Sequence, residues 1–371
     1  MHDTLLPMIE LPTEYTKILY QLENVDIPRY ASTRNFLDGK VSHLSPFISR
    51  GVLSLPQIRQ QVIEKFTDVQ AHRFICELTW REYFQRLWWK YHDGILANIK
   101  EPSHYNVREG LSTAIAKANT GIHVLDSQIN ELYATGYIHN HVRMYLASLA
   151  CPIGQCDWKI PSQWMYYHLL DGDIASNTLS WQWVAGTFTG KKYIFNQENL
   201  NHYSSTSQRN TFIDLSYEDI SDLPVPEKLR ELSHITHKTL LPNTPLPLLD
   251  YSKPLILYNS YNLDPLWEKE TDANRVLLLE PSHFDRFPVS EKVIEFIFSL
   301  SSNIKGIQIF TGELTELPGF ENFPVVISKE HPAFRHYPGI KTAAEWMFPN
   351  VELTSSFSSF WKKCERSLKA I

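Results

Sequence analysis

The spacing of apolar residues divides the chain into a helical first half and a mixed second half. From about residue 10 to residue 200, apolar positions recur at intervals of three and four between short breaks marked by Gly and Pro, which is typical of amphipathic helices. No strand-like alternation competes there, so we expect a mainly helical domain. The clearest predicted helices span residues 55–66, 71–91, 123–135, 138–150 and 162–170.

The pattern changes after a segment rich in proline. Six prolines lie between Pro224 and Pro254, which indicates a linker with little regular structure. Beyond it, short apolar runs alternate with helical patterns, which predicts a small open α/β sheet. The predicted strands span 255–258, 276–279, 306–310, 324–327 and 351–353, and the predicted helices span 290–301, with Ser290 as N-cap, and 356–369.

Length supports this division, because 371 residues are many for one hydrophobic core. We predict a helical domain over residues 1–215, a linker over 216–253 and a small α/β domain over 254–371. The fold class is therefore mainly α, with a smaller open-sheet α/β domain after the helical one.

Aromatic residues are concentrated in the helical part. They make up 13% of the chain, and seven of the ten tryptophans lie between Trp80 and Trp183. A large helical core that happens to use indoles is one explanation, and a site that needs indoles is the other. The net charge of −6 does not indicate a nucleic-acid binder, although a nearly neutral helical part can still carry a local basic groove.

Targeting and metal signals are weak. The chain does not begin with a basic segment and a long apolar run, and 18 apolar residues never follow one another, so we expect a cytoplasmic protein without a membrane span. The four cysteines lack CxxC pairing, which favours reduced thiols over disulfides or a zinc site. We therefore predict no metal site.

The most informative stretch runs from Asp157 to Trp183. It combines four tryptophans with Asp171-Gly172-Asp173 and Asn177. Indoles beside carboxylates and an amide suit a flat, redox-active ligand such as a flavin, whose ring needs aromatic neighbours and whose polar edge needs fixed hydrogen bonds. Taken alone, the two aspartates would more often form an exposed turn.

Three upstream segments add to this interpretation. Ser45-Pro46 is typical of a helix start, which is either a plain cap or an anion site. Glu77 and Trp80, three residues apart, share one face of a predicted helix, as in many amphipathic helices. In 137–150 a second, polar and small-residue stripe suits a cavity wall better than a solvent face; it comprises Tyr137, Asn140, Arg143, Met144 and Ala147.

Together, over about residues 20–205, these motifs resemble the FAD-binding helical domain of the photolyase and cryptochrome family. The matching segments are Tyr30 with Arg34-Asn35-Phe36, Val41-Ser42-His43-Leu44-Ser45, Glu77-Leu78-Thr79-Trp80-Arg81-Glu82, Tyr137 to Met144, Asp171-Gly172-Asp173, Asn177 and Trp181-Gln182-Trp183. Val41 stands where the phosphate-binding segment of the family begins with Thr.

The resemblance implies FAD as cofactor. It assigns cofactor contacts to Tyr30, Ser42, His43, Leu44, Ser45, Arg143, Asp171, Asp173 and Asn177. Asn177 would face the flavin N5 atom, where a neutral amide favours the fully reduced, repair-competent state. Trp181 and Trp158 match the inner members of an electron relay, and Tyr105 is the candidate for its outer member.

The resemblance also implies a substrate. Asn140 and Met144 have the identities found in photolyases for cyclobutane pyrimidine dimers. In such enzymes, blue light drives an electron from reduced flavin into the dimer, the cyclobutane splits and the electron returns. The implied catalytic set is Glu77, Trp80, Asn140, Met144, Asn177, Trp181 and Trp158, and the implied contacts with damaged DNA are Glu77, Trp80, Arg81, Tyr137, Asn140, His141, Met144 and Trp183.

Two departures keep an alternative open. Tyr137 replaces the usual Trp and His141 replaces an Arg that holds the DNA backbone, and a mostly neutral His is a poorer phosphate partner. A cryptochrome-like photoreceptor that acts on a signalling partner is therefore the alternative. A light-independent flavin oxidoreductase is a third, but the chain contains no nicotinamide-binding motif.

The C-terminal region also bears on the resemblance. Family members normally begin with an α/β domain that binds a light-harvesting antenna, whereas this chain begins almost at the helical part. Residues 254–371 could be that domain in a new position, and the sequence does not identify a second chromophore.

Overall fold

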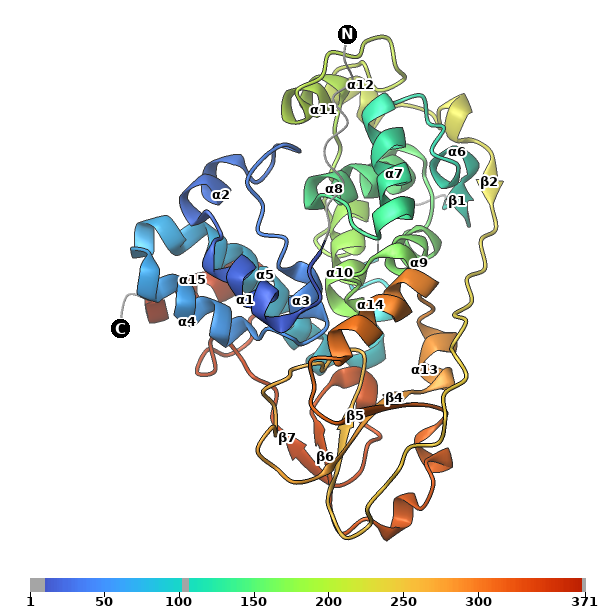
Figure 1. The fold of residues 1–371 in the computed structure, drawn as a ribbon. Coiled ribbons are helices and arrows are strands. Elements are labelled where there is room, and N and C mark those ends of the chain that lie inside the picture. Colours follow the sequence, from blue (N-terminus) through green and yellow to red (C-terminus); the bar gives the residue numbers. More distant parts are fainter. Residues whose placement is uncertain (1–10, 102–106, 369–371) are drawn as a thin grey trace. The chain divides into compact units, whose positions relative to one another are not determined.

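In the computed structural model, residues 11–101 and 107–368 are described, and they form two compact units (Figure 1). The first unit holds residues 26–41 and 90–237, and the second holds 11–25, 42–89 and 238–368. Both units are therefore discontinuous in sequence, unlike the expected domains, whose boundaries stay a prediction.

The first unit is helical, as the spacing of apolar residues predicts. Its described elements are α2 (Ile27–Thr33), η1 (His92–Leu96), β1 (Leu111–Ser112), α6 (Thr113–Ala116), α7 (His123–Thr135), α8 (Asn140–Ser148), the π-helical turn η2 (Leu149–Ile153), α9 (Lys159–His168), α10 (Ile174–Ala185), α11 (Gln197–Ser204), α12 (Tyr217–Ser221), η3 (Glu227–Leu229) and β2 (Leu232–Ser233).

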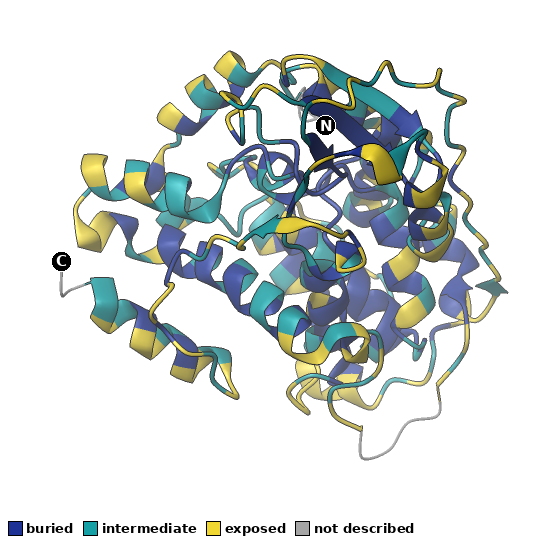
Figure 2. Ribbon diagram, turned by 90° about the horizontal axis from the view of Figure 1, so that it is seen from below, coloured by how far each residue is buried: buried dark blue, intermediate teal, exposed yellow. Residues whose placement is uncertain are grey.

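Helix α10 packs against α8 and α9, and their buried faces form the core of this unit. Figure 2 shows the buried residues of the protein in dark blue. Helix α7 ends at Gly136, whose φ of 74° is left-handed and where a Cβ would meet the Leu170 side chain at 2.7 Å. Only glycine fits this turn, which sets the path from α7 into α8.

The second unit combines helices with the predicted sheet. Its described helical elements are α1 (Tyr15–Glu23), α3 (Ser45–Ser49), α4 (Leu55–Lys65), α5 (Asp68–Tyr91, whose last two residues belong to the first unit), α13 (Pro281–Arg286), α14 (Glu291–Ser301), η4 (Leu314–Glu316), η5 (Phe320–Asn322), η6 (Pro332–Phe334) and α15 (Phe357–Leu368). Ser290 stands at the N-cap position of α14, as expected, but its side chain makes no cap hydrogen bond.

The sheet is parallel throughout and has the order β5-β4-β3-β6-β7. Its strands are β3 (Leu255–Tyr258), β4 (Asn274–Leu279), β5 (Ile307–Thr311), β6 (Val326–Lys329) and β7 (Ile340–Thr342). The predicted strand at 351–353 is wrong. The Val351 side chain is buried outside the sheet, and its carbonyl oxygen accepts from Arg86, so its apolar character does not mark a strand. The fifth strand, β7, begins with the exposed Ile340 and has no apolar run to reveal it.

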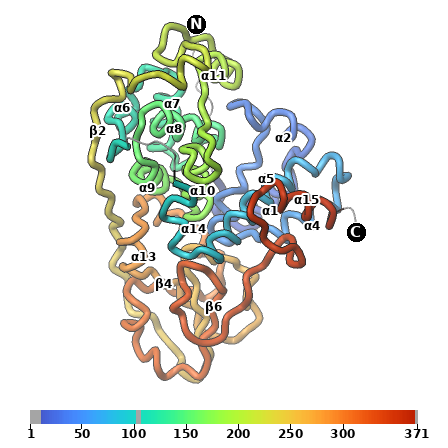
Figure 3. Tube along the Cα trace, turned by 180° about the vertical axis from the view of Figure 1, so that it is seen from behind, coloured from blue at the N-terminus to red at the C-terminus, as the bar shows by residue number. Residues whose placement is uncertain are grey.

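Within the expected linker, residues 234–250 form no helix or strand. The earlier part holds α12, η3 and β2, and β2 pairs antiparallel with β1. Within the second unit, Thr239 Oγ1 donates to Val289 O at 3.0 Å and Leu248 N donates to Gln308 Oε1 at 2.7 Å. The segment, coloured yellow in Figure 3, is therefore extended but held by hydrogen bonds.

Candidate functional site

A buried ion pair joins α8 to the turn before α10 in the first unit. Arg143 Nη2 lies 2.9 Å from Asp171 Oδ2, and the Asp171 side chain is only 2% exposed. The same guanidinium donates from Nε and Nη2 to Ile138 O, at 3.1 and 3.0 Å. It also lies 5.4 Å from the centre of the Tyr137 ring, a cation–π distance. Tyr137, Arg143 and Asp171, all predicted site residues, are therefore brought together.

Asp173 has a local structural role beside its predicted one. Its Oδ1 accepts from Ser176 N at 2.7 Å, so it is the N-cap of α10. A Cβ at Gly172 would meet Leu169 O at 3.0 Å, which explains why glycine separates the two aspartates. The alternative of an exposed turn is excluded, because Asp171 and Asp173 are both buried. Contact between Asp173 and a flavin stays a prediction.

Asn177 lies one turn after Asp173 on α10 and is half-buried. Its Nδ2 donates to Ser162 O of α9 at 2.9 Å, which fixes the orientation of the amide. Among the described residues, no hydrogen-bond donor reaches its Oδ1. The amide therefore presents an acceptor to whatever lies beside α10, which fits the N–H edge of a reduced flavin.

The two predicted relay tryptophans are both buried in the core of the first unit. Trp158 and Trp181 are each 2% exposed, and Trp158 Nε1 donates to Asn98 Oδ1 at 2.8 Å. Trp183 is partly buried beside Tyr193, with ring centres 5.8 Å apart. Tyr105 lies outside the described residues. Core packing explains the burial of these indoles and is compatible with electron transfer.

The predicted substrate residues on helix α8 differ in their exposure to solvent. Asn140 is exposed and Met144 half-buried, on the polar stripe that the sequence predicts. His141 is buried: its ring stacks on Tyr145 at 4.4 Å and its Nδ1 lies 2.7 Å from Asn35 O. Burial is the main cause that lowers the pKa of His141, so the ring is neutral near pH 7. In this conformation His141 packs inside the first unit, and its contact with DNA stays a prediction.

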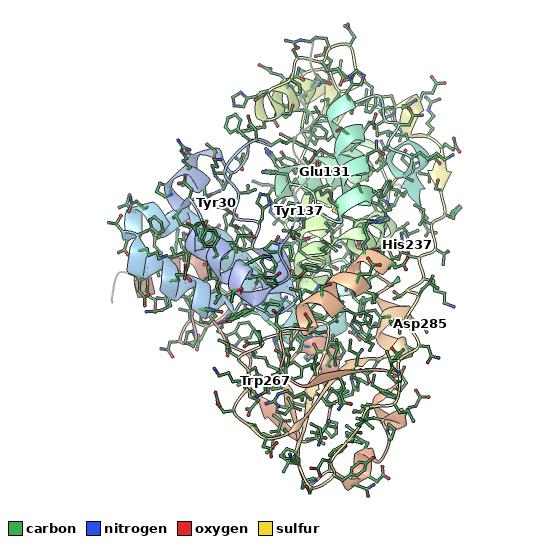
Figure 4. All side chains as sticks on the ribbon, viewed as in Figure 1. Tyr30, Glu131, Tyr137, His237, Trp267 and Asp285 are labelled. Carbon is green, nitrogen blue, oxygen red and sulfur yellow. The ribbon has the colours of Figure 1, made fainter. Side chains whose placement is uncertain are left out.

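Tyr30 lies on α2, in the first unit with Tyr137, and Figure 4 labels both side chains. The phosphate-binding segment that was predicted to follow it, Ser42 to Ser45, belongs to the second unit. Gln21 Nε2 supports this segment by donating to Ser42 O at 3.0 Å and to His43 O at 3.1 Å.

The structure confirms the predicted helix start at Ser45-Pro46, but Ser45 is the first helical residue and not the N-cap. Helix α3 begins at Ser45, and its N-cap is Leu44, which makes no side-chain cap bond. Pro46 still lies in the first turn, where its missing N–H costs nothing. His43 takes a left-handed φ of 52°, and burial lowers its pKa. Pyrophosphate binding by this segment stays a prediction.

The predicted substrate residues of α5 all have partners inside the second unit. Glu77 Oε1 lies 2.9 Å from Arg73 Nη2, and Arg81 Nη2 donates to Ser49 Oγ at 2.6 Å. Trp80 stacks on Phe357 of α15, with ring centres 3.5 Å apart and planes 11° apart. Trp80 was expected to face a lesion, and in this structure Phe357 covers one of its faces.

Sequence reasoning missed Phe357 and Glu82. Glu82 is fully buried and accepts from Met347 N and Phe348 N, at 2.5 and 3.3 Å, while Arg86 lies 2.9 Å away. Burial raises the pKa of Glu82, and Arg86 opposes this shift. The aromatic spacing of Phe357, Phe360 and Trp361 was the available signal, but a chain pattern does not say which surface a helix covers.

Comparison with known proteins agrees with these motifs. Residues 74–222 match a family model described as the FAD binding domain of DNA photolyase. A deoxyribodipyrimidine photo-lyase of Thermus thermophilus is 34% identical over 166 residues, which cover 43% of this chain and 39% of the relative. One from a Synechococcus strain is 30% identical over 246 residues, 63% of this chain and 48% of the relative.

The matched region, residues 74–222, belongs to the photolyase and cryptochrome family. A cryptochrome DASH of Danio rerio is 29% identical over 169 residues, 43% of this chain and 32% of the relative. Both branches therefore appear among the relatives, and the matches span less than half the length of each.

A cryptochrome structure from Synechocystis sp. PCC6803 is 25% identical and covers 53% of this chain and 44% of its own, with a TM-score of 0.47. The family assignment of residues 74–222 rests on the sequence matches. The family model covers every predicted site residue from Glu77 to Trp183. Tyr30 and Ser42 to Ser45 lie before the region that this model matches.

The described residues contain neither a membrane-spanning helix nor a cluster of metal-ligating side chains. No helix within 11–101 and 107–368 is long and apolar enough to cross a membrane. Over the same residues, three or more His, Cys, Asp or Glu side chains nowhere gather as metal ligands would. The four cysteines are buried and are not paired in disulfides. Burial raises the pKa of Cys156 to about 11, so this thiol is protonated near pH 7.

Proposed function

We propose that this protein binds FAD and splits cyclobutane pyrimidine dimers in DNA under blue light. The observation that carries the proposal is Asn177, a half-buried amide whose Nδ2 is held by Ser162 O and whose Oδ1 is left to accept. A neutral acceptor suits the N5–H of a reduced flavin, and reduced flavin is the state that can give an electron to a dimer. The match of residues 74–222 to an FAD binding domain supports the same cofactor.

The residues of the first unit fit the ring of FAD. Arg143 and Asp171 supply a buried, mutually neutralised pair, and the core contains the indoles of Trp158 and Trp181. When bound, reduced FAD would supply the electron for ring opening and take it back afterwards. The chain's part is to fix the ring edge with Asn177 and Asp173 and to carry electrons inward through the two indoles. The second chromophore, if any, is not assigned.

The proposal includes the α/β part. We propose that residues 254–371 are the antenna-type domain of the family in a new position. Their five-stranded parallel sheet supports this, because strands β3 to β7 occur in the order three, two, one, four, five, the order of doubly wound nucleotide-binding sheets.

A cryptochrome-like photoreceptor is the alternative, and two observations favour it. Phe357 covers Trp80, and His141 is buried, so two predicted DNA contacts are engaged within the chain. Such a protein would keep FAD and the indole pair, and would signal through a protein partner instead of repairing DNA.

One assay separates the two functions. Purified protein loaded with FAD and kept reduced is illuminated with blue light together with oligothymidylate that contains cyclobutane dimers. Repair predicts that dimers disappear in the light and not in the dark. Persistence of the dimers with FAD bound removes the repair function, and a protein that cannot be loaded with FAD removes both candidates.

A pair of variants tests the role of Asn177 in the same assay. Asn177→Asp places a carboxylate where a neutral acceptor is needed, so we expect FAD to bind and splitting to fall by about tenfold or more, the effect typical of losing one well-placed polar group. Asn130→Asp makes the same change at an exposed position of α7 and should leave splitting unchanged. Equal rates in both variants would show that Asn177 does not face the flavin.

A further inference from the structure

The stack of Phe357 on Trp80 resembles the packing of a nucleobase on an indole. The two rings are nearly parallel, 11° apart, with centres separated by 3.5 Å, and Tyr83 meets Phe357 edge-on at 5.8 Å. Both members of the stack are only half-buried. A flat aromatic ring therefore already lies on the side chain that is proposed to contact a pyrimidine.

Helix α15, which begins with Phe357, is bound to α5 through one face. Phe360 and Cys364 are fully buried, and the Phe360 ring lies 5.4 Å from that of Tyr83. His72 of α5 lies edge-on to Trp361 at 5.2 Å and 3.0 Å from Glu365 Oε1. Lys362, Lys363 and Arg366 lie on the exposed face of the helix.

The segment before α15 is held to α5 by a separate set of bonds. Glu82 accepts from Met347 N and Phe348 N, and Arg86 donates to Phe348 O at 2.7 Å and to Val351 O at 2.9 Å. Tyr83 OH donates to Thr354 O at 3.2 Å. Residues 355–356, two exposed serines, then lead into the helix. The segment before α15 and the helix itself are therefore held to α5 by different contacts.

We propose that Phe357 occupies the nucleobase position on Trp80 and that α15 must move aside before a pyrimidine can stack there. The inference rests on the proposed function in one respect, the assignment of Trp80 to the substrate. Helix α15 then competes with DNA, because an unpaired or damaged pyrimidine must replace the Phe357 ring on Trp80. The occupant that displaces it is single-stranded or flipped-out DNA, because stacking on an indole suits bases of any sequence.

Opposite substitutions at one position test the competition. In the full-length, FAD-loaded protein, Phe357→Ala removes the competing ring, and Phe357→Trp enlarges it. We expect Phe357→Ala to bind dimer-containing oligothymidylate about tenfold more tightly, since stacking of one base is worth that order of affinity, and Phe357→Trp to bind it more weakly. Ser358→Ala, at the exposed neighbouring position, is the matched control and should not change the affinity.

The readout is the dissociation constant in the dark, measured by fluorescence anisotropy of a labelled oligonucleotide. FAD content and thermal midpoint show that each variant is folded. Equal affinities of wild type, Phe357→Ala and Phe357→Trp would overturn the inference, and so would an absence of binding by all three.

The proposed function is judged separately, by splitting in the light. Tighter binding by Phe357→Ala without splitting would keep the competition and remove repair. If wild type and Phe357→Ala both split dimers and bind the oligonucleotide with equal affinity, the proposed repair function is supported and the competition by Phe357 is contradicted.

Discussion

Helices α10 and α5 both carry residues that the sequence assigns to ligands, and the structure treats them differently. On α10, Asn177 is held through one atom and keeps the other as an acceptor. On α5, Glu77 is paired with Arg73 and Trp80 is covered by Phe357. Identity of a motif therefore shows which chemistry a helix can offer, whereas long-range packing decides whether that chemistry faces a ligand or the chain itself.

The largest expected effect lies on the α10 side of this comparison. Replacing Arg143 by Ala leaves the buried Asp171 without its guanidinium partner, and breaking a buried pair costs about 3–5 kcal/mol. We expect a loss of about 3 kcal/mol in the free energy of unfolding, together with loss of FAD. Urea denaturation measures the first and flavin absorbance the second.

Arg209 provides the matched control in the same unit. It forms a surface pair with Asp214 at 3.9 Å, with 66% of the arginine side chain exposed, so Arg209→Ala should change stability by less than about 1 kcal/mol. Similar losses in the two variants would mean that the buried pair has no special role in the α8–α10 core.

On the α5 side, a substitution of Glu82 should lower the stability of the C-terminal segment that α5 holds. Glu82→Gln turns an amide N–H₂ toward Met347 N or Phe348 N, and leaving such a buried donor unsatisfied costs about 1–3 kcal/mol. We expect about 2 kcal/mol lower stability and faster hydrogen exchange over residues 346–368. Exchange that stays slow in these residues would show that Glu82 does not hold the C-terminal segment.

The sequence predicts elements that depend on local spacing better than it predicts contacts between segments far apart in the chain. The helix predicted at 123–135 and the strand at 255–258 agree with α7 and β3, because apolar spacing reports a buried face directly. The predicted strand at 351–353 failed because burial of Val351 comes from packing on α5, which a local pattern does not distinguish from a sheet.

The site shows the same limit. Arg143 and Asp171 were assigned to the cofactor and Tyr137 to DNA, and the structure brings all three together. His141 and Trp80 were assigned by their positions in motifs, and their surroundings depend on Asn35 and Phe357, which are far from them in sequence. Nothing in a motif specifies such partners.

A smaller effect concerns pH in the first unit. His237 stacks on Tyr167 at 4.0 Å, and burial lowers its pKa from 6.5 to about 4. Between these two values the unfolded chain binds more protons than the folded one, so stability falls as the pH drops from 6.5 toward 4. We expect His237→Phe to reduce this dependence, measured as the difference between urea midpoints at pH 7 and pH 5. Since burial also lowers the pKa of His141, some dependence should remain.

The smallest expected effect on stability separates electron transfer from packing in the α8–α10 core. Trp181→Phe and Trp164→Phe each remove a fully buried indole from the same core, so each should cost about 1–2 kcal/mol. Of these two residues, Trp181 matches the relay and Trp164 does not. Trp181→Phe should therefore slow photoreduction of bound FAD, followed by flavin absorbance under blue light, while Trp164→Phe leaves it unchanged. If both variants slow it equally, loosened packing is the cause; if neither does, electrons reach the flavin by another route. Equal stability with unequal photoreduction would assign a function to an indole that burial alone cannot distinguish from its neighbour.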